Sequence, residues 1–375
     1  MSKYSKQTLA VVAAVLFLAG LGFSASEKVE TLRIGQKAPD FNLPGVDGLN
    51  YKLADFANAD ILVIVFTCNH CPTAQAYEER IKKLAADYKN KGVALIAISP
   101  NDPRAVRLDE LGYSDMGDSL EDMKNRAKDM KFNFPYLYDG DEQRVSLAYG
   151  PTRTPHVFIF DRQRKLRYVG RIDDSEKSRP VKSRDTRNAI DALLKGRKVP
   201  VETTRTIGCS IKWSSKQESV KESFERWSRE NVAVETADSK SIKDLVKNDS
   251  GKLRLVNVWA SWSGPSVKQL QEFVTINRMY RKRNFELITI SADSPNRRSK
   301  VLSFLKKQQA SCKNYLFNSE DEYELMAAVD ENLLGGIPYT ILIQPGGKVI
   351  YRSVGIIEPF ELKKNIVGHL GRYYK

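Results

Sequence analysis

The 375-residue sequence predicts an α/β fold in two similar halves. At this length a single hydrophobic core is unusual, so two domains are expected. Continuous aliphatic runs, typical of parallel strands covered on both faces, alternate with amphipathic stretches of helical length. The same order of elements occurs twice, which indicates an internal duplication. Each half is therefore expected to hold a mixed central sheet flanked by helices.

Hydrophobic patterning defines the elements of the first half. In chain order they are a strand over 61–66, a helix over 77–88, a strand over 92–98, a helix over 120–130, a hairpin of 157–160 with 166–169, and a helix over 186–194. Strands alternate with helices first, and an antiparallel pair and a helix complete the unit.

The second half repeats this order. Its expected elements are a strand over 255–260, a helix over 267–280, a strand over 285–290, a helix over 298–308, a hairpin of 339–343 with 348–351, and a helix over 358–370. Between the halves the sequence turns polar. We therefore predict a first domain over 27–213, a linker over 214–230 and a second domain over 231–375.

The N-terminus has the pattern of a signal peptide over residues 1–26. Lys3 and Lys6 precede an apolar run over 9–23, and small residues follow at 24–26. The run is short for a spanning helix, which needs about 20 apolar residues. An uncleaved N-terminal anchor is the alternative. Either way the folded part is expected outside the cytoplasm, periplasmic or secreted, with no membrane span in the mature chain.

The net charge of +14 comes from basic residues spread along the whole chain. No nucleic-acid-binding motif accompanies them, so no nucleic-acid partner is expected. The charge is interpreted as a solvated surface that favours anionic partners or membrane surfaces.

Only four cysteines are present, and two of them form the motif Cys68-Asn69-His70-Cys71. Haem attachment would need a histidine directly after the second cysteine, where Pro72 stands. A four-cysteine zinc site would need a second close pair. A strand that delivers two cysteines to a helix N-terminus favours thiolate formation there. The motif therefore predicts thiol–disulfide exchange, with Cys68 and Cys71 catalytic and no cofactor.

His70 lies between the two cysteines. Its imidazolium would stabilise a Cys68 thiolate and make the disulfide more oxidising. The alternative is a histidine that only caps the loop. Thr154 and Pro155 precede the 157–160 strand, and Ile337 and Pro338 hold the same place in the second half. This repetition predicts a cis proline beside the cysteines, with Thr154 offering backbone groups to a substrate.

Three further residues leave alternatives open. His156 follows Pro155, and Cys68, Cys71 and His156 together would suit copper or zinc; packing or substrate contact is the other interpretation. Cys209 could be an additional redox cysteine, a partner of Cys312, or simply a buried small side chain. Cys312 is isolated in the sequence and receives no role.

The first half resembles the peroxiredoxin-like branch of the redoxin and alkyl-hydroperoxide-reductase superfamily. The matching segments are 35–43, 66–72, 134–138, 152–161, 171–174 and 208–213. The second half is similar to the thioredoxin-like reductases of bacterial envelopes. Their Trp-Ala-x-Trp-Cys-x-Pro-Cys stands here as Trp259-Ala-Ser-Trp-Ser-Gly-Pro-Ser266.

This resemblance implies a thioredoxin fold in each half, with Cys68 attacking and Cys71 resolving. Peroxiredoxins carry Pro-x-x-x-Thr-x-x-Cys. When the motif is counted back from Cys68, Ile61 stands at its Pro position and Val65 at its Thr position. Thr67 is the nearest hydroxyl and a candidate substrate contact. The departure favours disulfide exchange over peroxide reduction.

The second half lacks cysteines at its motif, and serine forms no disulfide. It is therefore expected to be a pseudo-domain that binds a redox partner or braces the first domain. The resulting hypothesis is an extracytoplasmic thiol–disulfide oxidoreductase acting on protein or small-molecule thiols and disulfides. A thiol peroxidase with Cys68 as peroxidatic residue and a non-enzymatic copper, zinc or partner-binding module are the alternatives.

Overall fold

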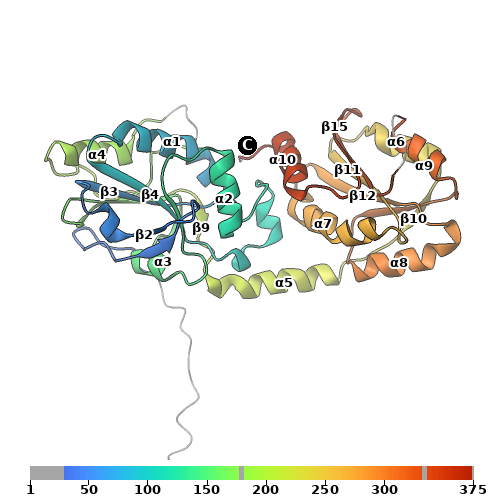
Figure 1. Cartoon of the computed structure of the whole chain (residues 1–375), viewed down its shortest axis with the longest axis horizontal. Helices are drawn as coiled ribbons and strands as arrows, with labels where there is room; N and C mark the ends of the chain where they lie inside the picture. Colours follow the sequence, from blue (N-terminus) through green and yellow to red (C-terminus); the bar gives the residue numbers. More distant parts are fainter. Residues whose placement is uncertain (1–28, 177–180, 332–335, 374–375) are drawn as a thin grey trace, which may run out of the picture.

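The computed structural model describes residues 29–176, 181–331 and 336–373. The predicted signal peptide over 1–26 lies outside them. Two halves lie side by side, each with a sheet between helices (Figure 1). Within the described residues, no helix is both long enough and apolar enough to cross a membrane.

The first half is built on a five-stranded sheet in the order β5-β4-β3-β7-β8. Strands β3, β4 and β5 are parallel, while β7 is antiparallel to both β3 and β8. The strands are β3 Ile61–Phe66, β4 Val93–Ser99, β5 Tyr136–Tyr138, β7 His156–Phe160 and β8 Leu166–Gly170. The helices are α1 Pro72–Tyr88, α2 Leu120–Asp129, α3 Arg144–Tyr149 and α4 Asp185–Leu194. The short pairs are β1 Asn42–Pro44 with β2 Asn50–Lys52, and β6 Arg153–Thr154 with β9 Cys209–Ser210.

Every side chain of β3 is buried, as its unbroken aliphatic run predicts. Alternate residues enter different cores because strand side chains point to opposite faces. Val63 and Val65 face the core that α1 covers, and Ile64 and Phe66 face the opposite one. The central strand is thereby fixed from both sides, together with the turn that follows it.

The second half has a six-stranded sheet in the order β10-β13-β12-β11-β14-β15. Its strands are β10 Glu235–Ala237, β11 Leu253–Trp259, β12 Phe285–Ser291, β13 Lys313–Phe317, β14 Tyr339–Ile343 and β15 Val349–Val354. Its helices are α6 Ser239–Lys247, α7 Gly264–Tyr280, α8 Arg298–Lys307, α9 Glu322–Val329 and α10 Pro359–Leu370. Strands β12-β11-β14-β15 repeat the pattern β4-β3-β7-β8: the first two strands are parallel to each other, and each of the next two strands is antiparallel to the one before it.

These elements confirm the predicted α/β class with two thioredoxin-like domains. The predicted linker contains a helix, α5 Gln217–Ser228, which runs along one side of the molecule between the halves (Figure 1). The helices predicted to start at residues 77 and 267 begin earlier, at Pro72 and Gly264. Residues 72–76 and 264–266 have no large apolar side chain that repeats at the helical period, so hydrophobic periodicity could not reveal these first turns.

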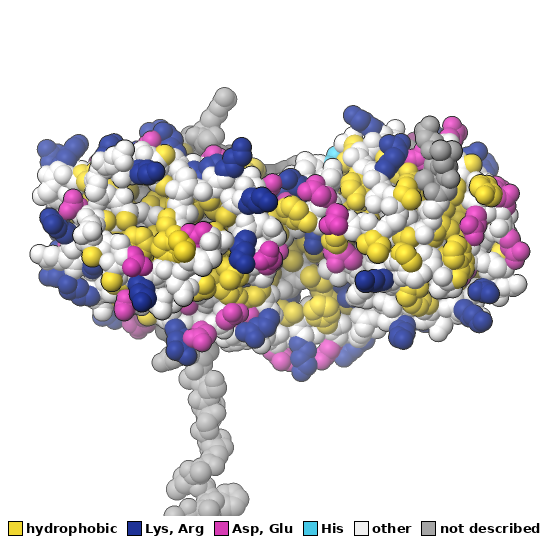
Figure 2. All heavy atoms as spheres, viewed as in Figure 1, with side chains coloured by type: hydrophobic (Ala, Val, Ile, Leu, Met, Phe, Trp, Pro, Cys, Tyr) yellow, Lys and Arg dark blue, Asp and Glu magenta, His cyan; other side chains and the backbone are white. Residues whose placement is uncertain are grey.

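The two halves touch through the segment 103–115 that follows β4. Val106 and Leu111 pack into the same core cluster as Phe273 and Tyr280 of α7. The buried Tyr280 hydroxyl donates a hydrogen bond to the Ser114 carbonyl at 2.6 Å. On the face shown in Figure 2, basic and acidic side chains are interleaved, as expected of a solvated surface.

Candidate active site

The Cys68-Asn69-His70-Cys71 turn joins β3 to α1. Cys71 is the N-cap of α1, and Pro72 occupies the first helical position, where a missing N–H costs little. The Cys71 sulfur accepts the Ala74 backbone N–H at 3.4 Å. Because a helix N-terminus favours negative charge, this position stabilises a thiolate on Cys71.

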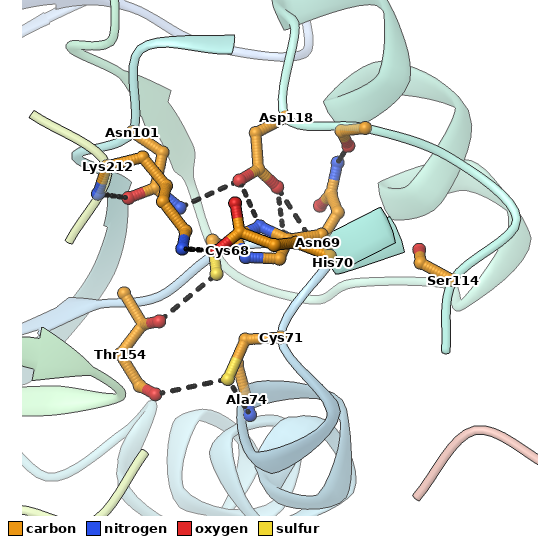
Figure 3. A network of polar contacts seen from close by, with 12 residues as sticks. Cys68, Asn69, His70, Cys71, Ala74, Asn101, Ser114, Asp118, Thr154 and Lys212 are labelled. Carbon is orange, nitrogen blue, oxygen red and sulfur yellow. Dashed lines mark hydrogen bonds and ion pairs between the residues drawn. The ribbon is translucent and has the colours of Figure 1, made fainter. Parts of the chain in front are cut away.

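Both thiols contact Thr154, as Figure 3 shows. The Cys68 Sγ lies 3.1 Å from the Thr154 Oγ1, and the Cys71 Sγ lies 3.5 Å from the Thr154 carbonyl oxygen. The Thr154–Pro155 bond is cis, which confirms the sequence prediction, and Ile337–Pro338 is cis as well. The two cysteines are buried, with side chains 2% and 0% exposed respectively. One residue therefore holds both sulfurs beneath the surface.

A buried carboxylate holds His70. The Asp118 Oδ2 lies 2.5 Å from the His70 Nδ1. The Asp118 Oδ1 accepts the backbone N–H groups of Asn69 and His70, at 2.9 and 3.1 Å. The Asn101 side chain also donates to Asp118, at 2.7 Å. Burial alone would lower the pKa of His70, but the charge and hydrogen bond of Asp118, together with the charge of Cys71, outweigh it and raise that pKa, which favours the imidazolium.

The surroundings shift the pKa values of the two cysteines in opposite directions. Burial alone would raise the pKa of Cys71. Hydrogen bonds from Cys209 and Cys68, the His70 charge and the Ala74 N–H outweigh burial and hold that pKa well below its usual range. Burial, the hydrogen bond to Cys71 and the charge of Asp118 raise the pKa of Cys68 far above its usual range. These surroundings favour a thiolate on Cys71 over one on Cys68.

Two other predicted residues lie close by. His156 is buried and accepts the Thr152 backbone N–H at 3.2 Å; burial lowers its pKa to about 3. Thr67 is buried and lines a cavity of about 10 Å³ beside Cys68, too small for a substrate. Within the described ranges, the potential metal ligands that lie within 4.8 Å of one another are Cys68, His70 and Asp118, a set without His156. Two of these groups, His70 and Asp118, already bond each other.

The segment 207–213 returns from the far side of the domain to this site. Strand β9 pairs with β6 so that Cys209 lies opposite Thr154. Cys209 packs against the cluster formed by Cys68, Cys71 and Ala74. The Lys212 backbone N–H donates to the Asn101 side chain at 2.9 Å, which connects the segment to Asp118. Cys312 packs instead among residues of the second half.

The second half repeats the backbone arrangement without sulfur. Ser263 is the N-cap of α7 and accepts the Ser266 N–H at 3.5 Å. Its hydroxyl donates to the Ile337 carbonyl, before the cis proline, at 3.3 Å. These are the contacts that Cys71 makes in the first half.

Strand pairing fixes the same correspondence. Phe66 pairs with His156 and Val258 pairs with Tyr339, in each case the residue after the cis proline. Counting five residues onward from each strand position places Cys71 opposite Ser263. Cys68 then corresponds to Ala260, and Ser266 corresponds to Ala74. Matching Cys68-x-x-Cys71 directly to Ser263-x-x-Ser266 would be wrong by three residues.

Comparison with known proteins agrees with this architecture. Residues 34–169 match the AhpC/TSA family and residues 231–366 match the Redoxin family. The chain is a tandem of these two kinds of thioredoxin-fold domain, and it is an oxidoreductase.

The chain is also similar to individual proteins. The chain is 22% identical over 175 residues to the thiol-disulfide oxidoreductase ResA of Geobacillus thermodenitrificans, which covers 45% of this chain and 89% of that protein. It is 35% identical over 81 residues to a putative peroxiredoxin of Mycobacterium tuberculosis, covering 21% of this chain and 50% of that protein. The crystal structure of an uncharacterized conserved protein from Geobacillus kaustophilus is 41% identical, covering 49% of this chain and 94% of that chain, with a TM-score of 0.44.

Proposed function

We propose that this protein is a thiol–disulfide oxidoreductase with Cys68 and Cys71 as its redox pair, and that it acts outside the cytoplasm. The observation that carries the proposal is the placement of both sulfurs on Thr154, with Cys71 at the N-terminus of α1. The name of the ResA relative describes the same reaction. The location rests on the signal-like pattern of residues 1–26.

The roles of the two cysteines are the reverse of those expected from the resemblance. Cys71 is the attacking residue, because the helix N-terminus, His70 and the neighbouring thiols stabilise its thiolate. Cys68 is the resolving residue, because its pKa is raised and its thiol stays protonated.

The proposed reduction of a substrate disulfide begins at Cys71. The Cys71 thiolate attacks a substrate disulfide, a Cys71–substrate bond forms, and one substrate thiolate leaves and takes up a proton. Cys68 then loses its proton and attacks the Cys71 sulfur. A Cys68–Cys71 disulfide forms, and the second substrate thiol leaves. The dithiol is oxidised and the substrate disulfide is reduced to two thiols; the opposite direction reverses each step.

Reduction of a small aromatic disulfide and of insulin tests the proposal, with Cys68→Ser and Cys71→Ser as variants and Cys312→Ser as the matched control. Loss of turnover in both variants, with an unchanged control, is expected. A Cys68–Cys71 disulfide should appear in peptide mapping of the oxidised protein. Full activity of Cys71→Ser, or the absence of that disulfide, would contradict the proposal.

Peroxide reduction is a second candidate, favoured by the match of residues 34–169 to the AhpC/TSA family. Cys71 would attack a peroxide oxygen to give a sulfenic acid and an alcohol or water, and Cys68 would displace water to form the disulfide. Counted from Cys71, the Pro and Thr positions of the peroxiredoxin pattern hold Ile64 and Cys68. Because no hydroxyl stands there, we expect disulfide exchange to be the faster reaction. Hydrogen peroxide consumption, measured beside disulfide turnover, distinguishes the two.

A further inference from the structure

The proposed redox pair has a third sulfur beside it, and only this third sulfur is near the surface. Cys68 and Cys71 are buried, whereas Cys209 is partly exposed. Cys209 packs against the cluster that Cys68 and Cys71 form with Ala74. A substrate that approaches the pair from this side meets Cys209 first.

The backbone around Cys209 is fitted to this position. Cys209 lies opposite Thr154 in the β6–β9 pair. The preceding residue, Gly208, has a φ of +141°, and a Cβ added there would lie 2.0 Å from the Thr154 carbonyl oxygen. Only glycine allows the segment to approach so closely, and this approach brings Cys209 to the residue that holds Cys68 and Cys71.

Cys209 lies in the wall of a groove of about 610 Å³, a size typical of sites for small molecules. Its charged lining consists of Arg153, Arg171 and Arg205 against one acid, Glu176. The Glu176 carboxylate is engaged by the Thr73 hydroxyl at 2.8 Å. Arg171 is paired with Asp185 at 2.7 Å. The remaining positive charge, from Arg153 and Arg205, favours an anionic ligand.

We infer that Cys209 is a third redox cysteine that exchanges the disulfide between the buried pair and a small thiol carrying carboxylates, bound in this groove. The inference rests on the proposed Cys68–Cys71 pair and adds its route to the surface and the class of its co-substrate.

The electron transfer proceeds in three exchanges. The Cys209 thiolate attacks Cys71 in the Cys68–Cys71 disulfide; a Cys71–Cys209 disulfide forms, and Cys68 leaves and takes the proton of Cys209. The external thiolate attacks the Cys209 sulfur; a mixed disulfide forms, and the Cys71 thiolate leaves. A second external thiol attacks the mixed disulfide, releasing the small disulfide and restoring the Cys209 thiol. Two external thiols are oxidised, and the protein disulfide is reduced.

The direction of the second attack follows from acidity. In the Cys71–Cys209 disulfide, attack at Cys209 expels Cys71, whose thiolate the Ala74 N–H stabilises at the N-terminus of α1. Attack at Cys71 would expel Cys209, which lies on β9 and caps no helix. The thiol of lower pKa leaves faster. The exposed sulfur is therefore also the one at which attack is chemically favoured.

Peptide mapping of oxidised Cys68→Ser tests the intermediate, and a Cys71–Cys209 disulfide is expected. Reduction of the Cys68–Cys71 disulfide by 3-mercaptopropionate tests the route. Cys209→Ser should slow it at least about tenfold, whereas Cys312→Ser should match the wild type. Equal or faster reduction of Cys209→Ser, or no Cys71–Cys209 disulfide in Cys68→Ser, would overturn the inference. The proposed function would still stand if the Cys68–Cys71 disulfide forms in Cys209→Ser.

The charge of the groove is tested with thiols of similar size. Arg205→Gln should slow reduction by 3-mercaptopropionate about fivefold, as expected for one lost charge at close range. With neutral 2-mercaptoethanol the rate should change less than about twofold, and with cationic cysteamine it should rise. Comparing each thiol between variant and wild type cancels their different acidities. An equal effect on all three thiols would contradict the anionic co-substrate.

Discussion

The first turns of α1 and α7 have the same backbone design but different chemistry. Each N-cap side chain accepts the N–H three residues onward and faces the carbonyl that precedes a cis proline. In α1 this residue is Cys71, and in α7 it is Ser263. A thiol at such a position ionises readily, whereas a serine hydroxyl does not. The backbone thus supplies a binding position for an anion, and sulfur makes it reactive.

The surroundings of the two turns differ as well. At the position of His70 the second half has Trp262, which is 53% exposed. Asp293 accepts the Ser261 backbone N–H at 2.8 Å, as Asp118 accepts that of Asn69, but it has no imidazole to charge. The second cysteine of the pair also lies elsewhere. In the first half it is Cys68, which precedes the helix, whereas thioredoxin-like motifs have their second cysteine at the position of Ser266. The motif of the first half therefore differs from the thioredoxin motif by more than one substitution.

Cys71→Ser makes the first turn chemically equivalent to the second, and we expect the largest effect from it. Ser263 shows that serine fits this N-cap, so the fold should persist. Disulfide exchange should fall at least about a thousandfold, because a hydroxyl is a poor nucleophile and forms no disulfide. Circular dichroism and the rate of disulfide reduction measure the two effects. A folded variant with more than about a tenth of the wild-type rate would show that Cys71 is not the attacking residue.

Asp118→Asn keeps the shape of the site and removes the charge that favours the His70 imidazolium. The pKa of His70 should fall and that of Cys71 should rise. A rise of one pKa unit removes about tenfold of the thiolate. The pH profile of iodoacetamide alkylation at Cys71 should shift to higher pH, and disulfide exchange should slow by about the same factor at pH values below the pKa of Cys71. An unshifted profile would show that His70 does not control the reactivity of Cys71.

The same variant tests the stability of the ion pair. The pKa of Asp118 is lowered and that of His70 is raised. The stabilisation from Asp118 is present above its ordinary pKa and is lost as the pH falls through its folded value. That from His70 is present below its ordinary pKa and is lost as the pH rises through its folded value. Denaturant unfolding between pH 5 and 6 should therefore show the largest difference from the wild type, about 3 kcal/mol. A pH-independent difference would contradict a charged pair.

Adding sulfur to the second half gives the reverse test. Ser263→Cys with Ser266→Cys, in a chain whose Cys68, Cys71 and Cys209 are changed to serine, should form a disulfide. The new thiol at position 263 lacks an imidazolium neighbour, so its alkylation at pH 7 should be about fivefold slower than that of Cys71. Its couple should be the more reducing one, because its thiolate is less stabilised. Faster alkylation than at Cys71 would show that the backbone alone sets reactivity.

The sequence predicted the elements that patterning can reveal. Buried runs such as 61–66 and the repeated proline identified the central strands and the cis bonds. The resemblance assigned the attack to Cys68; the sequence also indicated that Pro72 stands in the first helical turn, but not that Cys71 is the residue whose sulfur caps that turn.

Asp118, Asn101 and Lys212 were not found because they reach the site through long-range packing. Asp118 is 48 residues from His70, and Lys212 is 111 residues from Asn101. No local spacing connects such pairs. The single usable signal was Gly208 beside Cys209, since a glycine next to a reactive residue indicates a close backbone approach.

The smallest expected effect concerns the contact between the two halves. Arg372, after α10, pairs with Asp115 at 2.8 and 2.5 Å, three residues before Asp118, and reaches Gln75 of α1 at 3.4 Å. The second half thus braces both the loop that holds His70 and the helix that Cys71 caps. Arg372→Ala should slow disulfide exchange about twofold and broaden the alkylation profile of Cys71, because Asp118 would be less firmly positioned.

Lys364→Ala, which removes a more exposed pair with Asp129 on α2, is the matched control and should change neither the exchange rate nor the alkylation profile. Equal effects of the two variants would mean that the contact stabilises the assembly without positioning the site.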